Sequence, residues 1–109
     1  MATRYKILGQ VAPAATTNTD LYTVPAGKDA IVSTIVVANR STATTYRIWA
    51  IPSGASLAYE HYLAYDVAVG NGDSTTITLG ITLTAGDVIG VRGTSANLSF
   101  SVFGSEIDF

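Results

Sequence analysis

The chain has 109 residues, no cysteine and a formal net charge of −2 at pH 7. The lack of cysteine excludes disulfide bonds and thiolate metal sites, and the acidic balance excludes the basic surface that nucleic-acid-binding proteins present. Charged residues make up 13% of the chain, against about 25% in an average domain. We therefore expect another protein to cover part of the surface of a single domain over residues 1–109. No apolar run is long enough to span a membrane, and no membrane partner is expected.

The first 18 residues are predicted to form an extended N-terminal segment. Residues 5–10 have the composition of one strand, whereas residues 11–18 (VAPAATTN) are small and polar. This second part could be a surface loop or an arm that crosses to a neighbouring subunit, and the loop is favoured because arms are rarer.

Residues 29–39 are predicted to form a central strand, because both of its faces are apolar. One face would carry Ile31, Ile35 and Val37, and the other Val32, Val36 and Ala38. A strand of this kind is usually covered on both sides. Residues 43–51 form the next predicted strand, whose second face is only partly polar.

Residues 75–84 show the clearest alternation of the chain. One face would carry Thr75, Ile77, Leu79, Ile81 and Leu83, and the other Thr76, Thr78, Gly80, Thr82 and Thr84. This pattern predicts a half-buried strand. Because Gly80 has no side chain to pack, the strand is expected to bend or bulge there and to pass from one sheet to the next.

Near the C-terminus, Leu98, Phe100 and Val102 alternate with serines and are predicted to face the core. Residues 104–109 are predicted to be a tail. Since a solvated tail would gain little from its apolar residues, Ile107 and Phe109 are candidate protein contacts. Tyr5 and Ile7, in the predicted strand over residues 5–10, are the other candidates.

About eight short strands separated by Gly, Pro and Asn turns predict an all-β fold. Regular spacing of this kind is typical of an antiparallel β-sandwich, here expected to be jelly-roll-like.

The densest group of chemically reactive side chains lies in residues 59–66 (YEHYLAYD), around His61. On a strand, His61 would point away from Glu60 and Asp66, so a catalytic arrangement is not expected. One histidine without any cysteine is also too few for a transition-metal site. We expect a structural histidine, no enzymatic activity, no metal and no cofactor.

Five aromatic residues fall in the two neighbouring strands of this region: Tyr46, Trp49, Tyr59, Tyr62 and Tyr65. The last four are the candidate aromatic surface. Such rings can pack inside a sheet, fill a protein interface or stack on sugars. The order of preference is packing, then interface, then a glycan platform.

Five segments carry a family resemblance: 6–10 (KILGQ), 20–28 (DLYTVPAGK), 33–41 (STIVVANRS), 60–66 (EHYLAYD) and 103–107 (FGSEI). With them the chain resembles, over nearly its whole length, small virion structural proteins of tailed bacteriophages, including those of cyanobacterial and marine phages.

The resemblance implies a non-enzymatic capsid decoration, or cement, protein on the outer surface of the virion. Its expected partners are further copies of itself, often as a trimer, and the major capsid protein. The alternative is a tail fibre or receptor-binding module that recognises a host glycan through Trp49, Tyr59, Tyr62 or Tyr65. The resemblance assigns no site residues.

Overall fold

A computed structural model describes residues 2–78 and 80–108, and nearly all of its regular structure is β. The strands are β1 (Thr3–Val11), β2 (Thr19–Thr23), β3 (Lys28–Asn39), β4 (Thr44–Ile51), β5 (Tyr62–Val69), β6 (Ser74–Ile77), β7 (Ile81–Thr84), β8 (Val88–Gly93) and β9 (Leu98–Asp108). A single turn of 3-10 helix, η1 (Tyr59–His61), precedes β5. Within the described residues, no helix is both long and apolar enough to cross a membrane.

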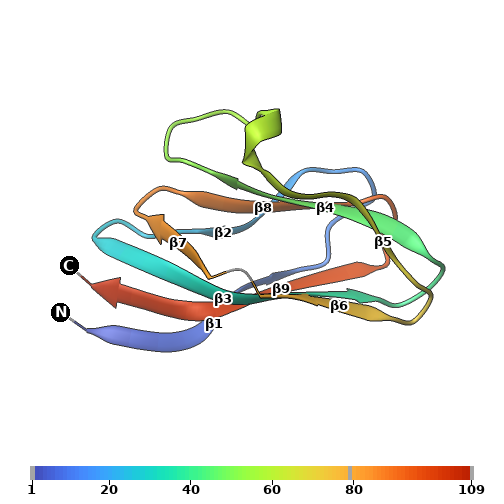
Figure 1. Cartoon of the computed structure of the whole chain (residues 1–109), viewed down its shortest axis with the longest axis horizontal. Coiled ribbons are helices and arrows are strands. Elements are labelled where there is room, and N and C mark those ends of the chain that lie inside the picture. Colours follow the sequence, from blue (N-terminus) through green and yellow to red (C-terminus); the bar gives the residue numbers. More distant parts are fainter. Residues whose placement is uncertain (1, 79, 109) are drawn as a thin grey trace.

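The strands form two antiparallel sheets that face each other (Figure 1). The larger sheet has the order β1-β9-β3-β6, with β7 also pairing with β3, and the smaller sheet has the order β2-β8-β4-β5. The predicted antiparallel β-sandwich is confirmed. If β6 and β7 are counted as one interrupted strand, the order fits an eight-stranded jelly roll.

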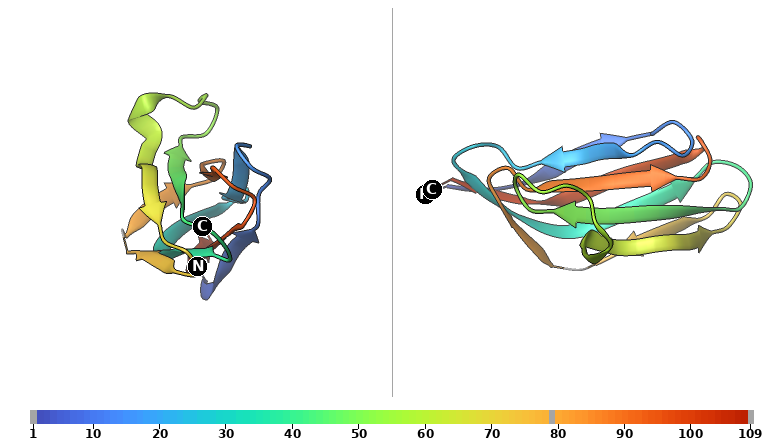
Figure 2. Two further views of the ribbon diagram at one scale, coloured as in Figure 1. Left: turned by 90° about the vertical axis from the view of Figure 1, so that its right-hand side faces the viewer. Right: turned by 90° about the horizontal axis from the view of Figure 1, so that it is seen from above.

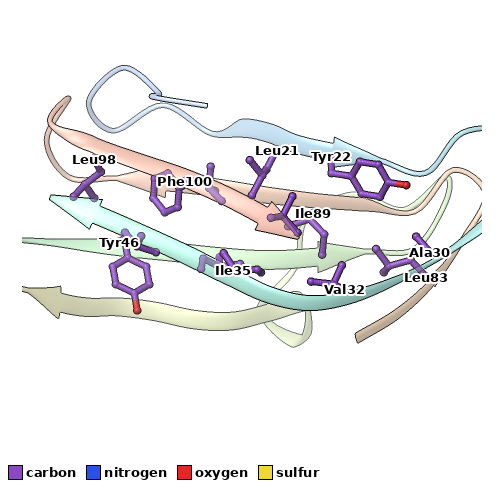
Figure 3. Packing of buried hydrophobic residues seen from close by; sticks show 14 of the residues in the cluster. Leu21, Tyr22, Ala30, Val32, Ile35, Tyr46, Leu83, Ile89, Leu98 and Phe100 are labelled. Carbon is purple, nitrogen blue, oxygen red and sulfur yellow. The ribbon is translucent and has the colours of Figure 1, made fainter. Parts of the chain in front are cut away.

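The core fills the space between the two sheets (Figure 3). Its largest members come from both layers, with Tyr46, Ile48 and Ile89 on the smaller sheet and Ile35 and Phe100 on the larger one. The rings of Tyr46 and Phe100 meet edge to face across the sandwich, with centroids 6.2 Å apart. Pairs of this kind add specific contact energy to the burial of apolar area.

Strand β3 is central, as predicted, but the assignment of its two faces was wrong at Ile31 and Val32. The pairing of β3 with β9 shifts between Val32 and Thr34, and this β-bulge reverses which side chains point inward. Ala30 and Val32 therefore share the buried face with Ile35, whereas Ile31 is 37% exposed on the outer face.

The strand predicted over residues 75–84 is interrupted. Gly80 has a left-handed backbone (φ 62°) between β6 and β7, and both pieces pair with β3 in the same sheet. The bend at Gly80 is confirmed, but the passage to the second sheet is wrong. Leu79 lies outside the described residues.

Both terminal segments lie in the larger sheet, at one end of the molecule (Figure 1). The 104–108 segment is the end of β9, paired with β1 on one side and β3 on the other, so it forms no separate tail. The stretch after β1 is a loop that packs on its own chain: Pro13 is buried, and the Thr16 amide donates to the Gly93 carbonyl at 2.8 Å. Phe109 lies outside the described residues.

Candidate functional site

The outer face of the larger sheet carries a group of apolar side chains, three of them exposed and two half-buried. We call it the apolar surface and define it by Tyr5, Ile7, Ile31, Phe103 and Ile107. Tyr5 is 86% exposed and Ile7 is 52% exposed. Both lie on β1, the edge strand, which therefore extends the surface to the margin of the sheet.

Strand register brings the members of the apolar surface together. Three rows run across β1, β9 and β3: Thr3–Ile107–Asp29, Tyr5–Ser105–Ile31 and Ile7–Phe103–Thr34. Directly paired residues of antiparallel strands point to the same side of a sheet. In these three rows Asp29 is the only charged residue, and Ser105 in the middle is 5% exposed. The predicted contacts Tyr5, Ile7 and Ile107 thus lie side by side, joined by Ile31 and Phe103, which the sequence did not single out.

The smaller sheet faces the viewer in Figure 2, right, with β5 at its edge. Its outer face differs from the apolar surface, because it carries aromatic rings and charged side chains. Trp49 packs edge to face on Tyr62, with centroids 5.7 Å apart, and Tyr62 packs in the same way on Tyr65 at 4.8 Å. Trp49 lies over Gly90 of β8, where a Cβ would collide with the indole. It is only 2% exposed.

The four predicted aromatic residues consequently form no single open platform. Tyr59 is 86% exposed and Tyr65 is 49% exposed, but Trp49 is buried and Tyr62 is half-buried. Tyr59 and Tyr62 line an open depression of about 320 Å³ together with Leu57, Ala58 and Glu60. Packing on the sheet, the preferred role for these rings, agrees with the burial of Trp49 and the partial burial of Tyr62.

The strand predicted through residues 59–66 begins only at Tyr62, because residues 59–61 form η1. His61 accepts a hydrogen bond from the Ala58 amide at its Nδ1 atom, at 2.9 Å, which closes the turn. Among residues 2–78 and 80–108, no three histidine, aspartate or glutamate side chains gather to hold a metal ion.

Arg47 is fixed in two ways beside the aromatic residues. Its guanidinium lies 4.1 Å from the centroid of the Tyr65 ring, and its Nε and Nη2 atoms donate to the two carboxylate oxygens of Asp66 at 2.7 and 3.2 Å. These hydrogen bonds from Arg47 hold the pKa of Asp66 below its usual value. Asp66 itself has a left-handed backbone with φ 52°.

The basic residues, which are scattered in the sequence, are partly gathered in space. Arg4, Lys6 and Lys28 line a cavity of about 210 Å³ at one end of the larger sheet, together with Glu106 and Asp108. Lys6 pairs with Glu106 at 3.1 Å, and Lys28 pairs with Asp108. The carboxylates balance most of the positive charge, so this cluster is no basic patch for nucleic acid.

No protein-family model matches the chain. No curated protein matches it either. Among solved structures, the chain is similar to a chain of the structure of infectious bursal disease virus, Gx strain, with a TM-score of 0.48 and 11% sequence identity. The similarity covers 96% of this chain and 31% of the viral chain, so this chain spans about a third of that chain's length.

Proposed function

We propose that this chain is a non-enzymatic structural protein of a tailed-phage virion, specifically a decoration protein on the outside of the capsid. The apolar surface is the observation that carries the proposal. In a chain whose charged residues are 13% of the total, the exposed Tyr5, Ile7 and Ile31 are neighbours on one face. The other exposed large apolar residues of the described chain lie in η1 and β5: Tyr59, Leu63, Tyr65 and Val67. Contiguous exposed apolar residues mark protein interaction sites.

The chemistry of the apolar surface suits a long-lived contact. The other members of its three rows are Thr3, Ser105, Thr34 and Asp29, and Asp29 already receives a hydrogen bond from the Thr84 hydroxyl at 2.8 Å. Little charge would have to be desolvated when a partner covers this face, and desolvation of charge is what makes many interfaces costly. On a capsid lattice, many equivalent copies would add further strength through avidity.

The proposed partners are the major capsid protein and other copies of the chain, as a trimer. A chain of this size buries only about two-thirds of the surface that its unfolded form exposes, so its stability is expected to be modest. Without cysteine it has no disulfide reinforcement. Association supplies the missing burial. Ile107 belongs to the proposed contact, whereas Phe109, the other predicted contact at this end of the chain, lies outside the described residues.

The experiment measures binding to particles that lack the chain, with cryo-electron microscopy of the reconstituted particles. Ile31→Lys places a charge in the apolar surface. Val67→Lys on β5 is a matched control, because Val67 has the same 37% exposure but lies in the other sheet. We expect density on the head exterior for the wild type and Val67→Lys, and at least tenfold weaker binding for Ile31→Lys. Equal binding of both variants would contradict the proposed surface, and density at the tail alone would contradict the proposed place.

Binding of a host glycan by a tail-fibre module is the second candidate, favoured by the exposure of Tyr59 and Tyr65. Aromatic faces that remain open to solvent can stack on sugar rings. Tyr59→Ala should then abolish binding to host cells while leaving attachment to the virion unchanged. Unchanged cell binding by this variant would reject Tyr59 as the contact.

A further inference from the structure

A second cavity of about 310 Å³ opens on the outer side of the smaller sheet, beside Tyr65. Its lining consists of Thr16, Thr45, Arg47, Asp66, Arg92 and Thr94. The volume lies at the lower end of the range of small-molecule sites, roughly 300–1,000 Å³. Three hydroxyls, one carboxylate and two guanidinium groups thus converge on a space fit for one small polar unit.

The two arginines are directly opposite each other. Arg47 of β4 pairs in register with Arg92 of β8, an arrangement that is unfavourable because like charges face each other across the strands. Asp66 neutralises Arg47 through two hydrogen bonds. Arg92 has no ion pair with any residue of 2–78 or 80–108, so the lining has a net charge of +1.

Backbone strain is concentrated at the same cavity. Within the described chain, the non-glycine residues with a left-handed backbone are Thr16 (φ 53°) and Asp66 (φ 52°), and both are lining residues. This conformation is particularly unfavourable for a β-branched residue such as threonine. The two positions are 50 residues apart in sequence and on different elements. Strained residues that meet at one place are characteristic of ligand-binding sites.

Local structure explains how the strain is maintained. Asp66 lies where the pairing of β5 with β4 shifts between Tyr46 and Ile48, and such a bulge redirects a side chain. Thr16 is held by the hydrogen bond from its amide to Gly93. The hydroxyls of Thr45 and Thr94 are 2.7 Å apart and complete the wall.

We infer that this cavity binds an acidic saccharide, whose carboxylate pairs with Arg92 and whose hydroxyls contact Asp66 and the three threonines. A single unbalanced positive charge suits one carboxylate. A phosphate dianion would be repelled by Asp66, whereas a sugar hydroxyl can donate to it. The half-exposed Tyr65 lies behind Arg47, whose guanidinium is 4.1 Å from the centroid of its ring, so the expected ligand contacts are the polar groups of the lining.

The inference does not depend on the proposed function. The cavity lies on the smaller sheet and the apolar surface on the larger one. An experiment can therefore reject the saccharide site without rejecting the proposed function, and the reverse. It also differs from the glycan platform expected from the sequence, since the residues that recognise the ligand are Arg92, Asp66 and threonines rather than Trp49 or Tyr59.

The test is an NMR titration of the full chain with methyl glucuronide, with methyl glucoside as the neutral matched ligand and sodium acetate as the anion alone. We expect saturable shifts of the Thr16, Arg92 and Thr94 amides with methyl glucuronide, and at least tenfold weaker binding of the other two compounds. Arg92→Gln should weaken glucuronide binding at least tenfold. Arg4→Gln, which makes the same change of charge on the other sheet, should leave it unchanged.

The inference would be overturned if these amides of the folded wild type did not shift at millimolar methyl glucuronide. It would also be overturned if acetate bound as tightly as the glucuronide, or if Arg4→Gln weakened glucuronide binding as much as Arg92→Gln. A preserved amide spectrum of Arg92→Gln establishes its folding, and Thr94→Val provides a second variant in the same wall. If Arg92→Gln instead abolished attachment to particles, the carboxylate partner would be a protein side chain and the saccharide assignment would be wrong.

Discussion

The Tyr22 hydroxyl donates a 2.6 Å hydrogen bond to the Glu106 carboxylate and so ties the two sheets together. Tyr22 belongs to β2 in the smaller sheet and Glu106 to β9 in the larger one. The second oxygen of the same carboxylate accepts a hydrogen bond from the Lys6 ammonium of β1 at 3.1 Å. Three strands from both layers therefore meet at one buried acid, whose side chain is only 8% exposed.

Removing this hydroxyl with Tyr22→Phe should lower the free energy of unfolding by about 1.5–3 kcal/mol, the range for hydrogen bonds to charged groups. Chemical denaturation followed by circular dichroism measures the loss. Tyr59→Phe is the control, because the same hydroxyl is removed from a residue that is 86% exposed, and a change near zero is expected. Equal stability of the two variants would show that the bond between the sheets contributes nothing.

The buried Glu106 should also make the stability of the fold depend on pH. The hydrogen bond from Tyr22 is the main cause that lowers the pKa of Glu106 below its ordinary value of 4.5. A carboxyl with a lowered pKa in the folded state stabilises the protein fully above pH 4.5 and loses this contribution as the pH falls through the lowered pKa. Thermal unfolding between pH 7 and pH 2 should therefore show a smaller acid decline for Glu106→Gln than for the wild type.

In alkaline solution the direction of the pH dependence reverses, and stability decreases as the pH rises. Burial, together with the hydrogen bond to Glu106, raises the pKa of Tyr22. A raised pKa gives stability that is complete below the ordinary tyrosine pKa of 10.0 and is lost as the pH rises further. Tyr22→Phe should flatten the decline of stability above pH 10.0, and an unchanged alkaline limb would argue against a protonated Tyr22 in the fold.

Much of the sandwich could be predicted from alternation alone. The inward set Leu98, Phe100 and Val102 is fully buried, as predicted, because period-2 burial follows directly from strand geometry. The error at Ile31 has a physical origin. A bulge depends on the opposite strand, here the pairing of β3 with β9, and no local pattern of residues 29–39 encodes it.

The candidate sites were less accessible to sequence reasoning, because they depend on strand register. Arg47 and Arg92 are 45 positions apart and become neighbours only through the pairing of β4 with β8. Tyr5, Ile31 and Phe103 join one surface for the same reason. A signal was nevertheless present for Ile107, since an apolar side chain near a chain end gains little from solvent.

Gly90 is predicted to be indispensable for the position of the tryptophan. A Cβ at Gly90 would overlap the indole of Trp49, so Gly90→Ala must displace a rigid ring and should cost about 1–3 kcal/mol, as overpacking does. Trp49 is the only tryptophan in the chain, and its emission should shift to the red. Gly70→Ala is the control, because a Cβ there meets Asp73 at an ordinary 3.7 Å. An unshifted emission in Gly90→Ala would contradict the packing described for Trp49.

His61 is predicted to act as a backbone acceptor rather than as a reactive group. His61→Ala removes the acceptor of the Ala58 amide and should lower stability by about 0.5–1.5 kcal/mol, the contribution of an ordinary hydrogen bond. Hydrogen exchange at Ala58 should accelerate while amides in β3 and β9 keep their protection, because the loss is confined to the turn before β5. His61→Asn retains a side-chain acceptor near the Nδ1 position and should restore much of the protection. If alanine and asparagine had the same effect on exchange at Ala58, the role assigned to Nδ1 would be wrong.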